Sequence, residues 1–270
     1  MLRTRLLTAV VLIPIVAWLI YLGDLPFLAL IAVLTTLAEI EFCRLTGGRG
    51  FQPIHLFGIA LVWLSLLDGE CLRAGLFRWG LVTILLASVS WRVFRFRQSD
   101  ARAWSGAIAS GLYVGLCGSY LIRLRALPYD GLWWTFILVP TTLFADAVAY
   151  LVGSVWGRHK LAPLLSSGKT VEGYVGGILL SAPLGALLGL VFGLKAGPES
   201  AVTWLRGLVL AFVIAAAAPM GDLAVSTFKR EAGVADSGKL LPGHGGVLDR
   251  MDTVLFAAAV GYACVIWLVN

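Results

Sequence analysis

A series of long apolar stretches constrains the fold of this chain more than any other sequence feature. The stretches cover residues 6–22, 25–42, 54–67, 76–91, 105–122, 132–152, 174–194, 203–221 and 253–269. Most of them approach the roughly 20 residues that an α-helix needs to cross the hydrocarbon core of a bilayer. Their apolarity is continuous, whereas the strands of a membrane barrel alternate. We therefore predict an all-α, polytopic integral membrane protein with about nine transmembrane helices, in which 54–67 is either a short span or a re-entrant segment.

The composition supports this class. Only 13% of the residues are charged and 59% are hydrophobic, whereas roughly a quarter of the residues of a soluble globular protein are charged. Arg3 and Arg5 precede the first apolar stretch as they would in a signal peptide. That stretch is long, however, and no Ala-x-Ala cleavage site follows it before the next one, so we expect a retained first helix.

The basic residues predict the orientation in the membrane, because cytoplasmic loops near span ends are enriched in Lys and Arg. With nine spans and a cytoplasmic N-terminus, fifteen of the 21 Lys and Arg residues fall on the cytoplasmic side. The six others are Arg73, Arg78, Arg123, Arg125, Lys195 and Arg206. The net charge of +6 thus reflects orientation and contact with anionic lipid, and no nucleic-acid partner is expected.

The four cysteines lack the spacing of a metal site or a disulfide framework and are expected to pack as small apolar residues. They are Cys43, Cys71, Cys117 and Cys264.

The two halves of the chain differ in the polar residues that they contain. Residues 1–130, with about five spans, are predicted to be a lipid-facing scaffold, and residues 131–270 to carry the site. In the first half, Glu39 and Glu41 lie at the cytoplasmic end of the second span. We interpret them as structural, with Glu41 pairing with Arg44 three residues later on the same helix.

The segment 144–173 contains the first group with chemical potential. Asp146 interrupts the sixth apolar stretch, where an ionisable side chain is costly, so we expect it to bind a cation or substrate; a structural pair or cap is the alternative. The string SSGKT at 166–170 offers glycine and lysine to phosphate. It is not a P-loop, because that motif needs glycine at position 163, which is Pro163, and because no strand is expected before it.

The eighth stretch continues into a second group. Asp222, Ser226 and Lys229 are spaced at i, i+4 and i+7, which places them on one helical face, with Arg230 adjacent. Pro219 and Gly221 are expected to loosen the helix just before Asp222. The ordinary alternative is that the basic residues mark the end of a span and that Asp222 neutralises one of them.

The string LPGHGGVLDRMD at 241–252 forms the third group. Its glycines let backbone amides approach phosphate, and Asp249 and Asp252 open the final helix where carboxylates can bind Mg²⁺. The alternative for Asp249 is helix N-capping, and the alternative for His244 is a loop histidine bonded to the backbone. Carboxylates that need cations, beside basic side chains that need anions, are typical of metal-assisted phosphoryl or nucleotidyl transfer.

This third group, together with the end of the eighth stretch, resembles the signature of phosphatidate cytidylyltransferases. The matching positions are Ser226, Lys229, Arg230, Asp236, Gly238, Pro242, His244, Gly245, Gly246, Asp249, Arg250 and Asp252. The segment from Asp146 to Gly173 is also similar to that family, whereas the first half matches only in hydropathy. Ala235, Ser154, Ser167 and Val171 depart from the family pattern. Lys239 is a candidate to replace the basic residue missing at Ala235.

The resemblance implies the reaction of CTP with phosphatidate to give CDP-diacylglycerol and pyrophosphate, with Mg²⁺ as cofactor. It leaves open a second cation and whether the protein is a monomer or a homodimer. It implies a multi-pass protein of the cell membrane with its active site at the cytoplasmic face. The implied catalytic residues are Asp222, Asp249, Lys229 and Arg230. The implied substrate-binding residues are Lys169, Glu172, Ser226, Lys239, His244, Gly245, Gly246 and Arg250. The implied metal ligands are Asp222 and Asp249, with Asp146 and Asp252 as accessory ligands.

Three other functions are alternatives to this reaction. A CTP-dependent kinase of a lipid alcohol would share many of these features but would release CDP instead of pyrophosphate. A transporter of phosphorylated solutes typically shows internal repeats, and none is visible in this sequence. A CDP-alcohol phosphotransferase would carry an Asp-Gly-x-x-Ala-Arg string, which the sequence lacks.

Overall fold

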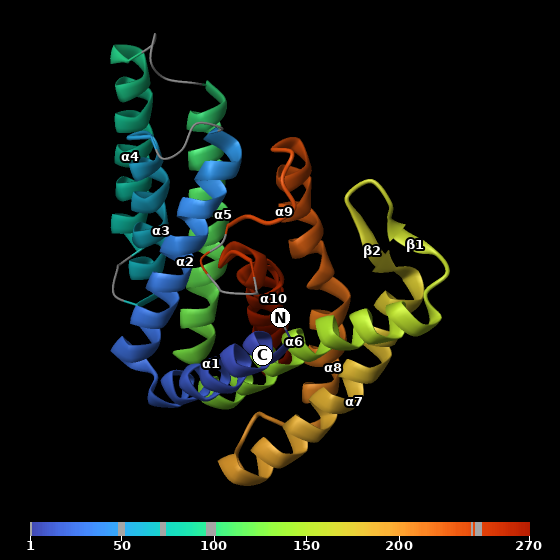
Figure 1. The fold of residues 1–270 in the computed structure, drawn as a ribbon. Coiled ribbons are helices and arrows are strands. Elements are labelled where there is room, and N and C mark those ends of the chain that lie inside the picture. The colour runs from blue at the N-terminus through green and yellow to red at the C-terminus, as the bar shows by residue number, and fades with distance from the viewer. Residues whose placement is uncertain (1, 48–51, 71–73, 96–100, 239, 241–244) are drawn as a thin grey trace. The chain divides into compact units, whose positions relative to one another are not determined.

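The computed structural model describes residues 2–47, 52–70, 74–95, 101–238, 240 and 245–270, and its described residues are predominantly helical (Figure 1). The helices are α1 (Leu2–Leu22), α2 (Asp24–Gly47), α3 (His55–Glu70), α4 (Ala74–Phe94), α5 (Ala101–Arg125), α6 (Gly131–Trp156), α7 (Val171–Ala196), α8 (Trp204–Ala217), α9 (Pro219–Glu231) and α10 (Leu248–Val269). Two strands, β1 (Lys160–Ala162) and β2 (Ser166–Thr170), lie between α6 and α7.

The predicted class, a polytopic membrane protein that is almost entirely α-helical, is confirmed. Within the described residues, 7 helical segments are long and apolar enough to cross a membrane, and α8 with α9 counts as one of them. Two shorter apolar segments, Leu12–Leu22 and His55–Asp68, coincide with the first and third predicted spans. The count of nine and the cytoplasmic N-terminus stay predictions.

The chain forms two compact units, and neither is continuous in sequence. Unit 1 comprises Met1–Arg123 and Phe228–Met251, and unit 2 comprises Leu124–Thr227 and Asp252–Asn270. The boundary therefore passes through α5, α9 and α10. The division of the chain into a scaffold half and a site half is a functional one and stays a prediction.

Unit 1 is built on helices α2 to α5, of which α3 packs against both α2 and α4. Helix α5 approaches α3 closely at a pair of glycines: a Cβ atom on Gly111 would lie 2.5 Å from the carbonyl oxygen of Gly58. Such an approach excludes side chains at the crossing. It also allows Ser110 of α5 to donate a hydrogen bond of 2.8 Å to the buried carboxylate of Glu39 on α2.

Unit 2 is built on α6, α7 and α8, with α7 in contact with both others. A Cβ atom on Gly207 of α8 would lie 2.3 Å from the carbonyl oxygen of Gly185 on α7, so these backbones also nearly touch. Helix α8 ends at Ala217 and α9 begins at Pro219. The predicted loosening before Asp222 is confirmed, because proline has no N–H with which to continue the helical ladder.

The prediction that no strand precedes the string SSGKT is wrong. Strands β1 and β2 pair as an antiparallel hairpin, with Lys160 opposite Thr170 and Ala162 opposite Ser166. The hairpin ends where Thr170 caps α7, accepting a hydrogen bond of 3.1 Å from the amide of Gly173. The string SSGKT is thus the second strand of the hairpin and not a phosphate-binding loop after a strand, which keeps the P-loop excluded.

The charge distribution leads to a prediction about topology. In a background in which alanine replaces the native cysteines, Ser167→Cys and Ala235→Cys place thiols at exposed positions of the two polar segments. A membrane-impermeant maleimide should label both only from the cytoplasmic side, and Asn270→Cys only from the opposite side, because the basic residues favour this orientation. Labelling of Ser167→Cys and Ala235→Cys from opposite sides, or of Asn270→Cys from the cytoplasmic side, would contradict the nine-span arrangement.

Candidate active site

A first polar cluster in unit 1 surrounds Asp249. The ammonium of Lys229, in the last turn of α9, lies 2.9 Å from Oδ1 of Asp249 in the first turn of α10. The other oxygen, Oδ2, accepts hydrogen bonds from the backbone amides of Ser237 (2.9 Å) and Gly246 (3.0 Å). The side chains of Lys229 and Asp249 are only 12% and 10% exposed. The carboxylate therefore joins α9, α10 and the loop between them, and we call these four residues the Asp249 cluster.

These contacts contradict the alternative in which Asp249 caps the N-terminus of α10. Helix α10 begins at Leu248, one residue earlier, and the amides of Ser237 and Gly246, which donate to Asp249, belong to the loop that precedes the helix. The first amide of α10, that of Leu248, donates instead to Glu41. Asp249 thus organises the loop, together with a lysine that the sequence predicted to bind phosphate.

The loop glycines have geometric requirements of their own. Gly245 has φ +81°, a conformation that residues with a side chain rarely adopt. A Cβ atom there would also lie 3.0 Å from Oδ2 of Asp249. Because the amide of Gly246 already donates to Asp249, the predicted contacts of Gly245 and Gly246 with phosphate stay predictions.

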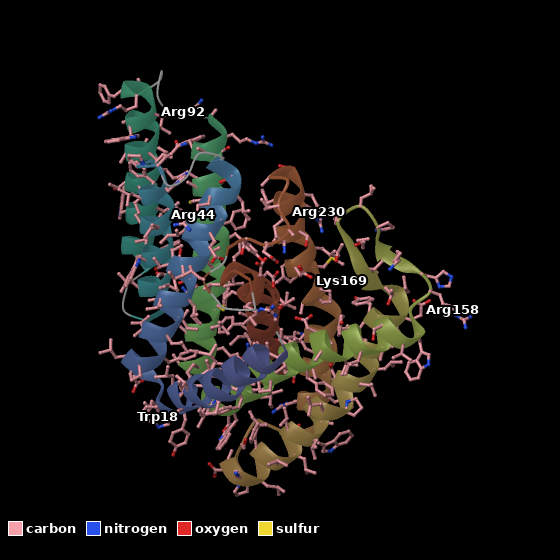
Figure 2. All side chains as sticks on the ribbon, in the orientation of Figure 1. Trp18, Arg44, Arg92, Arg158, Lys169 and Arg230 are labelled. Carbon is pink, nitrogen blue, oxygen red and sulfur yellow. The ribbon has the colours of Figure 1, made fainter. Side chains whose placement is uncertain are left out.

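A second polar cluster, in unit 2, surrounds Asp222. The ammonium of Lys169, on strand β2 (Figure 2), lies 2.7 Å from Oδ2 of Asp222. Ser226, one helical turn later on α9, donates a hydrogen bond of 3.2 Å to Oδ1. We call these three residues the Asp222 cluster; the predicted common face of Asp222 and Ser226 is confirmed.

Glu172 lies at the base of the hairpin. Its carboxylate accepts hydrogen bonds from the backbone amides of Arg158 (3.0 Å) and His159 (3.2 Å), and it also contacts Nδ1 of His159. These bonds fix the start of the hairpin that carries Lys169. The predicted role of Glu172 in substrate binding stays a prediction.

The accessory carboxylates both lie in unit 2. Asp146 is half-buried on α6, and Asp252 is almost fully buried on α10, where its Oδ1 accepts a hydrogen bond from the amide of Thr253. Helices α9 and α10 meet closely at this level, because a Cβ atom on Gly221 would lie 2.2 Å from the carbonyl oxygen of Asp252.

The remaining predicted residues are basic. Arg230 and Arg250 are exposed at the ends of α9 and α10. The predictions for Lys239 and His244 fall outside the described residues.

The carboxylates of Asp222 and Asp249 offer the oxygen donors that Mg²⁺ prefers. Within the described ranges of the chain, no group of three or more His, Cys, Asp or Glu side chains could hold a metal ion. Mg²⁺ usually keeps several water ligands and is bound through one or two carboxylates together with substrate phosphates. Each of these carboxylates, taken by itself, has the chemistry to ligate a Mg²⁺ ion together with phosphate groups.

One further residue contacts the Asp249 cluster, and its role there was not predicted from the sequence. Glu41 of α2 is completely buried and accepts hydrogen bonds of 2.9 Å from Ser237 Oγ and from the amide of Leu248. The ion pairs among the described residues do not include the expected one with Arg44. A carboxylate in an apolar helix is costly, and this cost could have indicated that Glu41 has a specific role. The partners of Glu41 could not be predicted, because they are about 200 residues away in sequence.

Comparisons with known proteins show the family of the chain. A protein named phosphatidate cytidylyltransferase from Bacillus subtilis is 31% identical over 264 residues, which is 94% of each chain. One of the same name from Brucella abortus is 35% identical over 268 residues, 97% of this chain and 92% of the relative. The model of the cytidylyltransferase family matches residues 3–268. The chain therefore belongs to the cytidylyltransferase family.

Proposed function

We propose that this membrane protein transfers the cytidylyl group of CTP to phosphatidate, forming CDP-diacylglycerol and pyrophosphate. The relatives over nearly the whole chain are named for this activity. The observation that carries the proposal for this chain is the Lys229–Asp249 pair, in which a cation suited to phosphate lies beside a carboxylate suited to a metal. Lys169 and Asp222 form a second pair of an ammonium and a carboxylate.

The reaction requires charge neutralisation more than acid–base chemistry. An oxygen of the phosphatidate phosphate, already anionic, attacks the α-phosphorus of CTP and forms the new P–O bond. The bond from the α-phosphorus to the bridging oxygen of the β-phosphate breaks, and pyrophosphate leaves with the electron pair. Negative charge spreads over the phosphate oxygens during this step, so fixed cations lower the barrier. No protein nucleophile is needed.

The basic residues of the two clusters are proposed to bind phosphate oxygens. Lys229 and Lys169 hold their ammonium groups against carboxylates, which keeps both side chains positioned before substrate arrives. A phosphate oxygen then competes with the carboxylate for the ammonium. Arg230, exposed beside Lys229, adds a planar donor group that suits phosphate.

Asp249 in unit 1 and Asp222 in unit 2 are each proposed as a carboxylate ligand of Mg²⁺, with Asp146 and Asp252 in accessory roles. Bound Mg²⁺ would supply positive charge to the phosphate oxygens and orient them. Within the protein, Gly246 and Ser237 fix Oδ2 of Asp249, so the direction of this carboxylate is set by the loop.

The proposed location is the cytoplasmic face of the cell membrane. Phosphatidate would reach the site sideways from the bilayer and CTP from the cytosol. The basic residues on the predicted cytoplasmic side favour contact with anionic lipid.

The assay of the purified protein with CTP and phosphatidate tests the proposed reaction. CTP labelled at the α-phosphorus should yield labelled CDP-lipid, and CTP labelled at the γ-phosphorus should yield labelled pyrophosphate in equal amount, both only with divalent metal. A CTP-dependent kinase would instead release CDP and move the γ-label to the lipid, which would contradict the proposal.

The substitution Asp249→Asn tests the role of the charge in the Asp249 cluster. Turnover per folded molecule at saturating Mg²⁺ should fall at least about 100-fold, or about 2.7 kcal/mol of barrier, because the anionic ligand is lost. The melting temperature should also fall, since an amide nitrogen cannot accept the bonds that both oxygens of Asp249 accept now.

The matched control is Glu231→Gln, the same change in the same unit, at an exposed residue whose pair with Arg102 is long at 3.4 Å. Both turnover and melting temperature should stay near those of the parent protein, because exposed pairs contribute little. Near-normal turnover of folded Asp249→Asn would remove Asp249 from the catalytic assignment.

A further inference from the structure

A buried carboxylate on α2 contacts the loop that positions Asp249. We propose that Glu41 is a positioning residue for the transfer reaction. Its carboxylate fixes the α9–α10 loop so that Asp249 stays in contact with Lys229. The loop comprises residues 232–247, of which 232–238, 240 and 245–247 are described. The inference rests on the proposed function, and it assigns Glu41 no contact with substrate.

The hydrogen bonds of Glu41 reach the two residues through which Asp249 is held. Its Oε2 accepts from Ser237 Oγ and from the amide of Leu248, each at 2.9 Å. The backbone amide of the same Ser237 donates to Asp249, and Leu248 directly precedes Asp249 in the chain. The amide of Leu248 is the first of α10 and has no acceptor within the helix. Glu41 therefore supplies the acceptor that orients the start of α10.

Two loop glycines lie so close to this carboxylate that neither position has room for a Cβ atom. A Cβ atom on Gly238 would lie 2.3 Å from Oε1 of Glu41, and one on Gly246 would lie 2.3 Å from Oε2. Real Cβ atoms do not approach other atoms this closely, so any side chain at either position would displace the carboxylate or the loop. The presence of glycine at both positions is thus explained by contact with Glu41.

Helix α2 is also attached to α9 beside this carboxylate. Phe42, the next residue, packs edge-on against Phe228 with ring centroids 4.8 Å apart and an interplanar angle of 61°. Phe228 immediately precedes Lys229. Adjacent residues of α2 thus contact both the helix that carries Lys229 and the loop that holds Asp249.

The proposal predicts a difference between two substitutions of Glu41. Both hydrogen bonds go to one oxygen, so the amide oxygen of Glu41→Gln can accept both, and kcat should stay within about 3-fold of the parent. Glu41→Met keeps the length but removes the acceptor, and kcat should fall roughly 10- to 100-fold with little change in KM for CTP. If Glu41→Gln lost as much activity as Glu41→Met, charge and not acceptor geometry would matter, and the positioning role would be overturned.

Glu39 provides the matched control, because it is equally buried on the same helix and two residues away. Its Oε1 accepts from Ser110 Oγ at 2.8 Å and from Cys43 Sγ at 3.1 Å, which are contacts with α5 and with α2 itself. Glu39→Met should change the melting temperature but leave kcat per folded molecule near the parent value. An equal loss of kcat in Glu39→Met and Glu41→Met would reduce Glu41 to a general packing role.

Ser237→Ala provides a second test with a smaller change. It removes one of the two bonds to Glu41, so it should reproduce part of the kcat loss. Combined with Glu41→Met, it should add little, because both changes break the same contact. Losses that multiply in full would show that the two residues act independently and would contradict the proposal.

Hydrogen exchange provides a readout that needs no turnover. The amides of Ser237, Gly246 and Leu248 should exchange faster in Glu41→Met than in the parent protein, and Glu39→Met should leave them unchanged. Unchanged exchange in Glu41→Met would overturn the positioning role. Absence of transfer activity in the parent protein would contradict the proposed function, whereas the exchange result would still decide the role of Glu41 in the loop.

Discussion

The carboxylate of Asp249 is the group on which the order of the α9–α10 loop depends. It accepts an ammonium on one oxygen and two backbone amides on the other, while its side chain is 10% exposed. A carboxylate this far removed from water must have both oxygens satisfied, because burial of an uncompensated charge is costly. Such a pair adds little net stability compared with apolar packing, but the loss of one partner leaves the other charge unpaired. The pair therefore fixes Ser237 and Gly246 relative to α10 more than it stabilises the fold.

Unit 2 also contains a pair of a lysine and an aspartate, but these side chains are more exposed. Lys169 and Asp222 are 24% and 26% exposed, about twice as much as the pair in unit 1. Their contact joins the hairpin to α9, and Glu172 fixes the hairpin at its base. A more exposed ion pair exchanges partners at lower cost, which is consistent with the phosphate binding that we propose for Lys169.

Much of the fold was predictable from hydropathy alone, because each span is a local property of about 20 residues. The break before Asp222 was predictable for the same reason, since Pro219 acts on its own helix. The β-hairpin was not predicted: its strands have three and five residues, too short for a periodic pattern, and it depends on Glu172 and Thr170. The contacts of Glu41 were missed because they join residues 196 and 207 positions apart, and periodicity within a helix does not predict such pairs. The types of residue in the site could thus be predicted, but not the bonds that arrange them.

The central claim is that these side chains position and neutralise phosphate groups while the lipid phosphate itself attacks the α-phosphorus. The stereochemical course of the reaction tests this claim directly. With CTP that carries sulfur on the α-phosphorus in one configuration, a single in-line displacement by phosphatidate inverts that configuration in the CDP-lipid product. Inversion is the result that our account predicts. Retention would indicate two displacements through a cytidylyl group bound to the protein, and it would contradict the absence of a protein nucleophile.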